Sequence, residues 1–142
     1  MVEADKIWHM STEPVSIMIV ESQPLMRSAL STALAAEGFK VAESVWNSQT
    51  MRTASKLRPD LVLLSVGASS WDDLKSISSL RQMLPSALIV ALITGEIPGQ
   101  EQAALGEGAH LVVHKTGSRS TLLKAVNKLL HKTQPVNMLA MS

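Results

Sequence analysis

The sequence contains no cysteine and no tyrosine, and its aromatic side chains are limited to three tryptophans and one phenylalanine. Without cysteine the chain can form neither a disulfide nor a thiolate metal site, and this composition fits a reducing compartment. So few aromatic rings leave little material for a platform on which single-stranded nucleic acid could stack. We therefore expect a cytoplasmic protein that does not itself bind nucleic acid.

A strong charge of one sign and a long hydrophobic run are also absent. Thirteen Lys and Arg side chains balance twelve Asp and Glu side chains, for a formal net charge of +1, so no global field attracts nucleic acid or an anionic membrane. The longest apolar runs, such as residues 87–93, are too short to cross a hydrocarbon layer of about 30 Å. Residues 1–14 carry three carboxylates and lack the apolar stretch of a secretory signal. We expect no membrane association.

What the chain does contain is enough apolar material for one domain. It has 142 residues, of which 46% are hydrophobic, and a chain of this size builds a core without external cross-links. Residues 1–14 are predicted to form a flexible leader and residues 15–132 a single domain. Residues 133–142 show no clear period and are predicted to be a disordered tail or the stub of a linker.

Short apolar runs alternate with helix-period segments along this domain. The runs predicted as strands are residues 15–20, 39–45, 60–65, 87–93 and 111–113. The predicted helices are residues 25–37, a helix capped by Asn47 or Ser48 and running to Leu57, a helix capped by Ser69 or Ser70 and running to Leu84, residues 99–107, and a last helix from Ser118. Such alternation is typical of an α/β fold with a doubly wound, five-stranded parallel sheet.

Four segments of the chain resemble the receiver domain of response regulators, over residues 15–130. They are VESQPLMRSAL after the first strand, RPDLVLLS at the third, LIT at the fourth and EGAHLVVHKT around the fifth. Their order and spacing resemble the receivers of the LuxR/NarL type, which precede a helix-turn-helix output module. The resemblance implies two-component signalling and a flavodoxin-like, CheY-like sheet with strand order 2-1-3-4-5.

The same resemblance assigns roles at the carboxyl ends of the strands, where open parallel sheets bind ligands. Glu21 and Ser22 stand where receivers hold Mg²⁺ with an acidic pair, and Ser65 stands at the phosphoacceptor aspartate. Thr94 and Lys115 stand at the hydroxyl and lysine that contact the phosphoryl group, and these two alone keep the receiver pattern. The chain thus resembles an atypical receiver with a degenerate phosphorylation pocket.

The residue types in this pocket disfavour phosphoryl transfer. Mg²⁺ prefers hard oxygen ligands that usually include carboxylates, whereas one glutamate beside two serines and a lysine has a formal charge near zero. A serine without an adjacent base is also a weak nucleophile. We therefore expect no metal, no cofactor and no enzymatic activity. Ser65 could simply fill a small site, Thr94 could serve as a strand former, and Lys115 could either bind an anion or pair with Glu21.

Two features concern the output surface, which receivers build from their fourth helix, fifth strand and fifth helix. Receivers commonly carry a rotating aromatic residue three positions before the lysine, and Val112 occupies that position here. We therefore expect a surface that does not switch through that side chain. His110 and His114 flank the fifth strand and could titrate near neutral pH. The last helix carries a basic face, interpreted mainly as a solvated surface, that consists of Arg119, Lys124, Lys128 and Lys132.

Two functions remain open from the sequence. The first is a signalling module that associates with proteins without phosphorylation, and we expect it to form a homodimer through the face built from residues 100–132. The alternative is a module that senses a small anion or a nucleotide in the strand-end cleft, with Ser22, Ser65, Thr94 and Lys115 as donors. An enzyme ranks last, because the chain has no glycine-rich phosphate loop and no paired catalytic carboxylates. DNA binding would belong to an output domain outside these residues.

Overall fold

The computed structural model describes residues 13–67, 71–95 and 97–133. The five strands are β1 (Ser16–Val20), β2 (Lys40–Ser44), β3 (Leu61–Ser65), β4 (Leu88–Ile93) and β5 (Leu111–His114). The five helices are α1 (Pro24–Ala36), α2 (Thr50–Leu57), α3 (Trp71–Met83), α4 (Gln100–Glu107) and α5 (Arg119–Thr133). Strands and helices alternate along the chain, as the sequence predicts.

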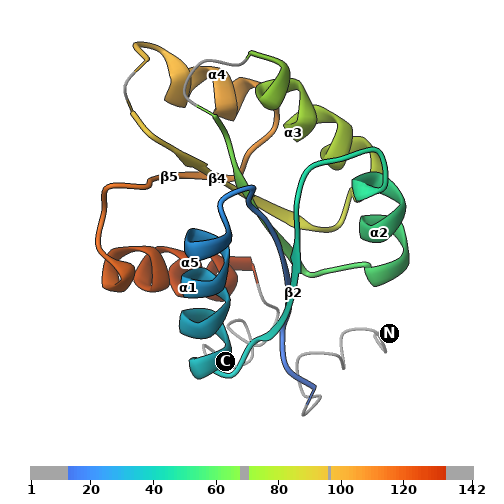
Figure 1. The fold of residues 1–142 in the computed structure, drawn as a ribbon, viewed down its shortest axis with the longest axis vertical. Coiled ribbons are helices and arrows are strands. Elements are labelled where there is room, and N and C mark those ends of the chain that lie inside the picture. The colour runs from blue at the N-terminus through green and yellow to red at the C-terminus, as the bar shows by residue number, and fades with distance from the viewer. Residues whose placement is uncertain (1–12, 68–70, 96, 134–142) are drawn as a thin grey trace.

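The strands form one parallel sheet in the order β2-β1-β3-β4-β5 (Figure 1). This order confirms the predicted CheY-like, flavodoxin-like fold. Helices α1 and α5 contribute to one hydrophobic core, and helices α2, α3 and α4 contribute to the other. The sheet is therefore the middle of three layers, with a core on each face.

The central strands are apolar on both faces because each face meets a core. In β3, Leu61 and Leu63 pack in the core on the α1 and α5 side, and Val62 and Leu64 pack in the core on the other side. All four side chains are fully or almost fully buried. An unbroken apolar strand of this kind is what a parallel sheet covered on both faces requires.

Glycines and a proline mark several boundaries where the sequence predicts them. Pro24 begins α1, where its missing N–H group costs no helical hydrogen bond. Gly38 and Gly108 follow α1 and α4 with φ angles of 95° and 119°, a conformation that glycine adopts with little strain. Arg58, which precedes Pro59, leaves the helical region with a φ of 48°.

The predicted cap of α2 is wrong. The helix begins only at Thr50, and Gln49 precedes it without a side-chain capping bond. Asn47 instead forms a local turn, in which its Oδ1 accepts the N–H of Gln49 at 2.7 Å and its own N–H donates to Thr50 Oγ1 at 2.8 Å. Asparagine competes for local backbone partners in this way, and the competition delays the helix.

The last helix begins where the sequence predicts, because Ser118 Oγ accepts the N–H of Thr121 at 3.1 Å. The proposed caps Ser69 and Ser70 lie outside the described residues, as do residues 1–12 of the leader and residues 134–142 of the tail. Among the described helices, none is both long and apolar enough to cross a bilayer.

Candidate functional site

The strand-end residues that the sequence singles out come from adjacent strands. Glu21 directly follows β1, Ser65 ends β3, Thr94 follows β4 and Lys115 follows β5. The register pairs Val20 with Leu64 across β1 and β3, so Glu21 and Ser65 occupy the next positions on neighbouring strands. Parallel pairing therefore places these residues at one edge of the sheet.

Glu21 and Lys115 form an ion pair at this edge. Glu21 Oε1 lies 3.6 Å from Lys115 Nζ, and the two side chains are 1% and 17% exposed. The other carboxylate oxygen, Oε2, accepts the backbone N–H of Gln23 at 3.0 Å. Oε1 itself has no hydrogen-bond partner, because the distance to Lys115 exceeds that of a hydrogen bond. The pair is nearly buried and formally neutral.

The hydroxyl-bearing residues differ from one another in their surroundings. Ser65 is half-buried, and its Oγ is shielded from solvent without a hydrogen-bond partner. Thr94 is half-buried immediately after β4, whereas Ser22 is exposed. The cluster at the strand ends, called the strand-end cluster below, is thus built on Glu21, Ser65 and Lys115.

Two polar residues that sequence reasoning missed contribute to this region. Arg27 donates from Nη1 to the backbone oxygen of Glu21 at 2.9 Å, and its Nε lies 3.6 Å from Glu43 Oε1. Gln100, which is 2% exposed, donates from Nε2 to the backbone oxygen of Gly67 at 3.2 Å, while its Oε1 has no partner. No motif identifies either residue. Arg27 lies on α1, six residues after Glu21, and Gln100 is the first residue of α4. Neither position has a sequence pattern that marks it as part of a site.

The donor set of the strand-end cluster limits its chemistry. It offers one carboxylate, already paired with an ammonium group, and one serine hydroxyl. Across the described ranges, no three His, Cys, Asp or Glu side chains come together as metal ligands. The arrangement can hold a charge pair and accept one or two further hydrogen bonds, and it brings no base to the Ser65 hydroxyl.

The residues around β5 are held by packing on one side and by an exposed polar contact at the carboxyl end. Val112 is half-buried and packs against the core on the α2, α3 and α4 side. At the carboxyl end of β5, His114 Nε2 lies 3.4 Å from Glu101 Oε1, and both side chains are about half exposed. An exposed pair of this kind adds little stability.

His110, which precedes β5, has a nitrogen donor beside each of its two ring nitrogens. Its Nδ1 accepts the N–H of Ile89 at 3.0 Å, and its Nε2 lies 3.2 Å from Arg81 Nη1. Burial and, to a lesser degree, the neighbouring Arg81 guanidinium lower the pKa of His110 below its ordinary value of 6.5. The charged imidazolium would face two donors and no acceptor, so this site favours the neutral ring.

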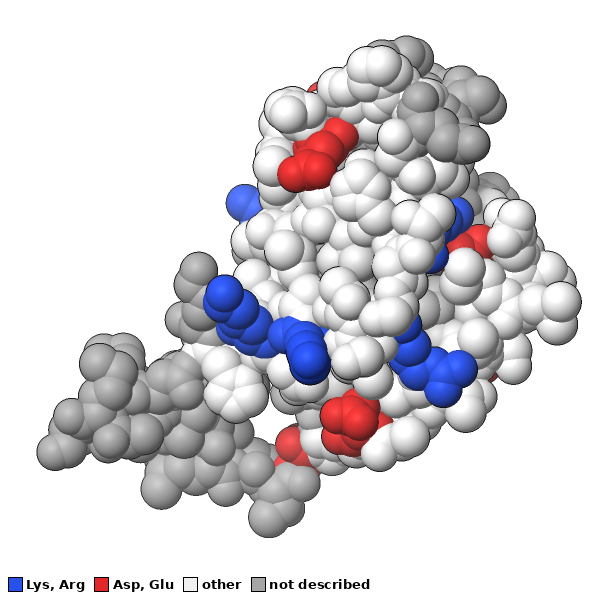
Figure 2. Space-filling model, turned by 90° about the vertical axis from the view of Figure 1, so that its left-hand side faces the viewer, with Lys and Arg blue, Asp and Glu red and all other residues white. Residues whose placement is uncertain are grey.

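The basic face of α5 is exposed, as the sequence predicts for Arg119, Lys124 and Lys128, and the side chain of Lys132 lies outside the described set. Figure 2 views the side on which β5 and α5 lie in Figure 1, and it shows Lys and Arg side chains in a band across its lower half. Carboxylates lie above and below this band rather than within it.

Comparison with protein families gives one match that covers most of the chain. The family described as response regulator receiver domain matches residues 17–127. The probable transcriptional regulatory protein TcrX of Mycobacterium tuberculosis is 26% identical over 121 residues, which are 85% of this chain and 52% of that protein. The KDP operon transcriptional regulatory protein KdpE of Escherichia coli is 32% identical over 94 residues, which are 66% of this chain and 41% of that protein.

Solved structures share the fold. A DNA-binding response regulator of the LuxR family from Staphylococcus aureus has a TM-score of 0.70 at 22% identity, with 80% of this chain and 97% of that one covered. The chemotaxis response regulator CheY4 of Vibrio cholerae has a TM-score of 0.72 at 20% identity, with 81% and 98% covered. The chain spans about half the length, or less, of the curated relatives it matches.

Proposed function

Because the chain belongs to the response regulator receiver domain family, we propose that it is an atypical receiver that signals by protein association without aspartyl phosphorylation. The observation that carries this proposal is the strand-end cluster. Its single carboxylate, on Glu21, lies 3.6 Å from Lys115 Nζ, and the strand that would present a phosphoacceptor ends in Ser65. The module is then not an enzyme, and its input is a binding event.

The cluster does not fit the Mg²⁺ ion that the family resemblance implies. A divalent ion beside Glu21 would have to displace or tolerate the Lys115 ammonium group. Among the described residues at the strand ends, Ser22, Ser65 and Thr94 supply no second carboxylate. Mg²⁺ gives up its water reluctantly and is usually held by carboxylates. Phosphoryl transfer also needs a metal or equivalent charge to neutralise the transferred group. We therefore assign no catalytic step to this site.

Association through one face is the second part of the proposal. The face consists of α4, β5 and α5, over residues 100–132, and we propose that two copies of the chain meet through it. Leu105 is 45% exposed there, and α4 presents the exposed Glu101 while α5 presents the exposed Lys124 and Lys128. Helices α4 and α5 flank β5 from opposite faces of the sheet, and their opposite charges allow a two-fold arrangement in which each helix meets its complement.

The relatives that this chain matches are longer than the chain itself. Two of them are named transcriptional regulatory proteins. We propose that this domain works in the cytoplasm and that any contact with DNA belongs to a part of the protein beyond these residues. The basic side chains on α5 then serve protein contacts.

Mass spectrometry after incubation with acetyl phosphate and Mg²⁺ tests the first part. We expect no mass increase and no change in oligomeric state, because the cluster lacks both a carboxylate nucleophile and a metal cradle. A stoichiometric phosphoryl adduct that hydroxylamine removes would refute the proposal. A receiver with the complete acidic pocket, treated in parallel, shows that the reagent is active.

Restoring the carboxylates one at a time separates the two deficits. Ser65→Asp supplies a nucleophile but leaves Glu21 as the only other carboxylate, so we expect it to stay essentially unlabelled. The double variant Ser22→Asp with Ser65→Asp supplies two more carboxylates, and we expect labelling that depends on Mg²⁺. Efficient labelling of Ser65→Asp alone would show that the cluster binds the metal better than its charge suggests.

Analytical ultracentrifugation across protein concentration tests the association. We expect a monomer–dimer equilibrium that Lys128→Glu weakens at least about tenfold, since the substitution places like charges across the face. The matched control is Arg52→Glu, which makes the same change at an exposed position on α2. A strictly monomeric chain, or an equal effect of both variants, would contradict the proposed face.

The anion-binding alternative is favoured by one observation. Ser65 Oγ is shielded and has no partner, and Lys115 provides a cation at the same edge of the sheet. The buried Glu21 carboxylate opposes an anion there. Thermal shift with inorganic phosphate decides between anion sensing and association. Binding that Lys115→Met abolishes and Lys56→Met preserves would support an anion sensor. The absence of such binding leaves association as the function.

A further inference from the structure

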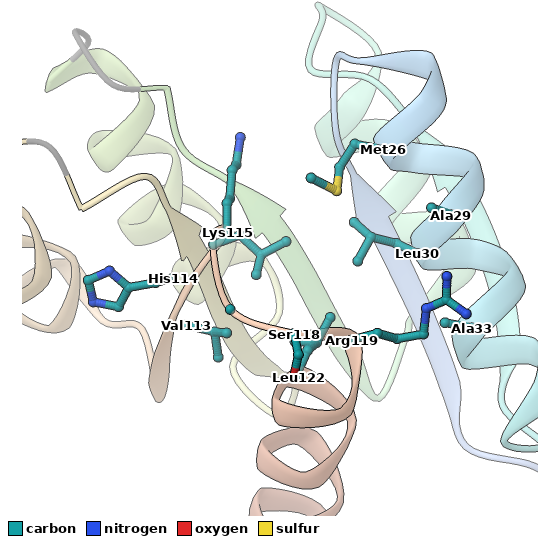
Figure 3. Close-up of a pocket in the computed structure, with 12 residues that line it drawn as sticks. Met26, Ala29, Leu30, Ala33, Val113, His114, Lys115, Ser118, Arg119 and Leu122 are labelled. Atoms are coloured by element: carbon teal, nitrogen blue, oxygen red, sulfur yellow. The ribbon is translucent and has the colours of Figure 1, made fainter.

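A mostly apolar pocket lies between α1 and the segment that joins β5 to α5 (Figure 3). Its volume is about 150 Å³. The apolar side chains that line it come from four elements and are Met26, Ala29, Leu30, Ala33, Leu92, Val113 and Leu122. In Figure 3, Met26 and Leu30 extend from α1 toward the side on which Lys115 and Leu122 lie. Its lining residues from Val113 to Leu122 fall within the range 100–132 proposed for association.

Small residues explain why the space between the two helices is not filled. Helix α1 contributes Ala29 and Ala33 at one helical turn's spacing, and Gly117 contributes no side chain from the opposite wall. Leu30 and Leu122 on the two helices are 8% and 5% exposed, so the helices pack around the hollow rather than across it. A pocket of this kind leaves apolar side chains facing water unless a ligand covers them.

The charged side chains that line the pocket are all basic. Lys115 and Arg119 line it, together with His114, and no carboxylate does. Lys115 pairs with Glu21 outside the pocket, whereas the Arg119 guanidinium group makes no hydrogen bond or ion pair with any residue that the structure describes. Figure 3 shows the Arg119 side chain reaching from α5 toward α1 beside Ala33. The pocket therefore combines an apolar interior with one uncommitted guanidinium group.

We propose that this pocket binds a small carboxylate whose apolar part is the size of one aromatic ring or a short aliphatic chain. An engineered cavity of about 150 Å³ with an apolar lining admits benzene, which sets the size of the apolar part. Arg119 sets the anionic group, because its planar guanidinium matches a carboxylate in two parallel hydrogen bonds. The geometry thus assigns a second ligand site that is distinct from the strand-end cluster, although Lys115 borders both.

Titration of the full chain with sodium benzoate, followed by methyl and backbone amide NMR, tests this site. We expect saturable shifts at Met26, Leu30 and Leu122, with a dissociation constant on the order of 1 mM or tighter for a ligand of this size. Benzyl alcohol is the matched neutral probe and benzylamine the matched cation. We expect benzyl alcohol to bind about fivefold more weakly or worse, and benzylamine to cause no saturable shift at these residues.

Two pairs of variants separate the pocket from the rest of the surface. Ala29→Leu fills the hollow from an exposed helix position where leucine is a good helix former, and we expect it to abolish the benzoate shifts. Ala36→Leu makes the same change at an exposed position of α1 outside the pocket and should leave them intact. Arg119→Gln should erase the preference for benzoate over benzyl alcohol, and Lys124→Gln on the same helix should preserve it.

Three results would overturn the proposal. The first is the absence of saturable shifts at Met26, Leu30 and Leu122 up to about 10 mM benzoate, far above the expected constant. The second is equal binding of benzoate and benzyl alcohol by the unmodified chain. The third is retention of the full preference for benzoate over benzyl alcohol in the Arg119→Gln variant. Circular dichroism of each variant confirms that a lost shift does not reflect unfolding.

Discussion

The two ends of the parallel sheet differ in whether their polar side chains are hydrogen-bonded. At the amino-terminal end, Asp60 Oδ2 accepts the N–H of Ser16 at 2.8 Å, and His110 Nδ1 accepts the N–H of Ile89 at 3.0 Å. At the carboxyl end, Glu21 Oε1 and Ser65 Oγ are shielded from solvent without a hydrogen-bond partner. Side chains at the first end complete the backbone ladder, whereas side chains at the second end leave bonding capacity unused.

This difference indicates which end is committed to stability and which to function. A buried polar group without a partner carries a desolvation cost of roughly 1–3 kcal/mol, and natural proteins retain such costs mainly where a site requires them. Open parallel sheets also bind their ligands beyond the carboxyl ends of the strands. Removal of these side-chain acceptors at the amino-terminal end should therefore destabilise the fold, whereas removal of the unpartnered Ser65 hydroxyl at the carboxyl end should not.

The largest effect is expected from His110→Ala. The variant leaves the N–H of the buried Ile89 without its acceptor, and we expect the free energy of unfolding to fall by about 1–3 kcal/mol. His114→Ala is the matched control at the other end of β5, where only an exposed contact to Glu101 is lost, and it should cost less than about 0.5 kcal/mol. Urea denaturation of both variants measures the difference, and equal losses would contradict the comparison.

A smaller loss is expected from Asp60→Ala, which removes the acceptor of the Ser16 N–H at a partly solvated position. We expect a cost of about 1 kcal/mol, the usual net value of one hydrogen bond. Asp60→Asn keeps an acceptor oxygen and should recover most of that loss. If the two variants are equally destabilised, the carboxylate charge rather than the hydrogen bond supports this end of the sheet.

The pH dependence of stability should show the lowered pKa of His110. The folded state holds this pKa below the unfolded value of 6.5, so the unfolded chain binds more protons between the two values. The stability that this group contributes therefore decreases as the pH is lowered through that range. It is fully present above about pH 6.5 and is lost as the pH falls through the folded pKa. The drop in the urea midpoint between about pH 7.5 and about pH 5 should shrink in His110→Gln. An unchanged drop would show that other groups dominate.

The smallest effect is expected from Ser65→Ala. Its hydroxyl has no hydrogen bond to lose, so we expect a change near zero or a stabilisation of up to about 1 kcal/mol. Ser44→Ala is the control, because Ser44 Oγ donates to the backbone oxygen of Ile19 at 2.9 Å, and its loss should cost about 1 kcal/mol. A clear destabilisation by Ser65→Ala, seen in urea denaturation, would show that the Ser65 hydroxyl has a partner after all.

Much of the fold follows from local sequence pattern. The apolar strand at residues 60–65, the proline before the first helix and the glycine after the fourth helix are predicted within one or two residues, because each reflects a local conformational preference. The start of α2 is not, since Asn47 can cap a helix or close a turn, and the choice depends on hydrogen bonds that the sequence does not specify.

The candidate site is predicted only in part. Glu21 and Lys115 are identified at the sequence level because strand ends converge in a parallel sheet. Arg27 and Gln100 are not, because their partners are backbone oxygens of Glu21 and Gly67, and any residue type offers a backbone oxygen. The pocket beside Arg119 also has no sequence signature, since it arises from the spacing of two helices rather than from a motif.

By itself, the sequence determined that this chain forms a parallel α/β sheet and which residues stand at its strand ends, with Glu21 as the carboxylate among them. Residue type and periodicity decide these properties locally. Only the tertiary structure decided that Glu21 forms an ion pair with Lys115 and that the Ser65 hydroxyl has no hydrogen-bond partner. It also decided that Ala29 and Gly117 leave a pocket beside Arg119. These outcomes depend on distances between segments far apart in the chain, and close packing across the sheet sets those distances.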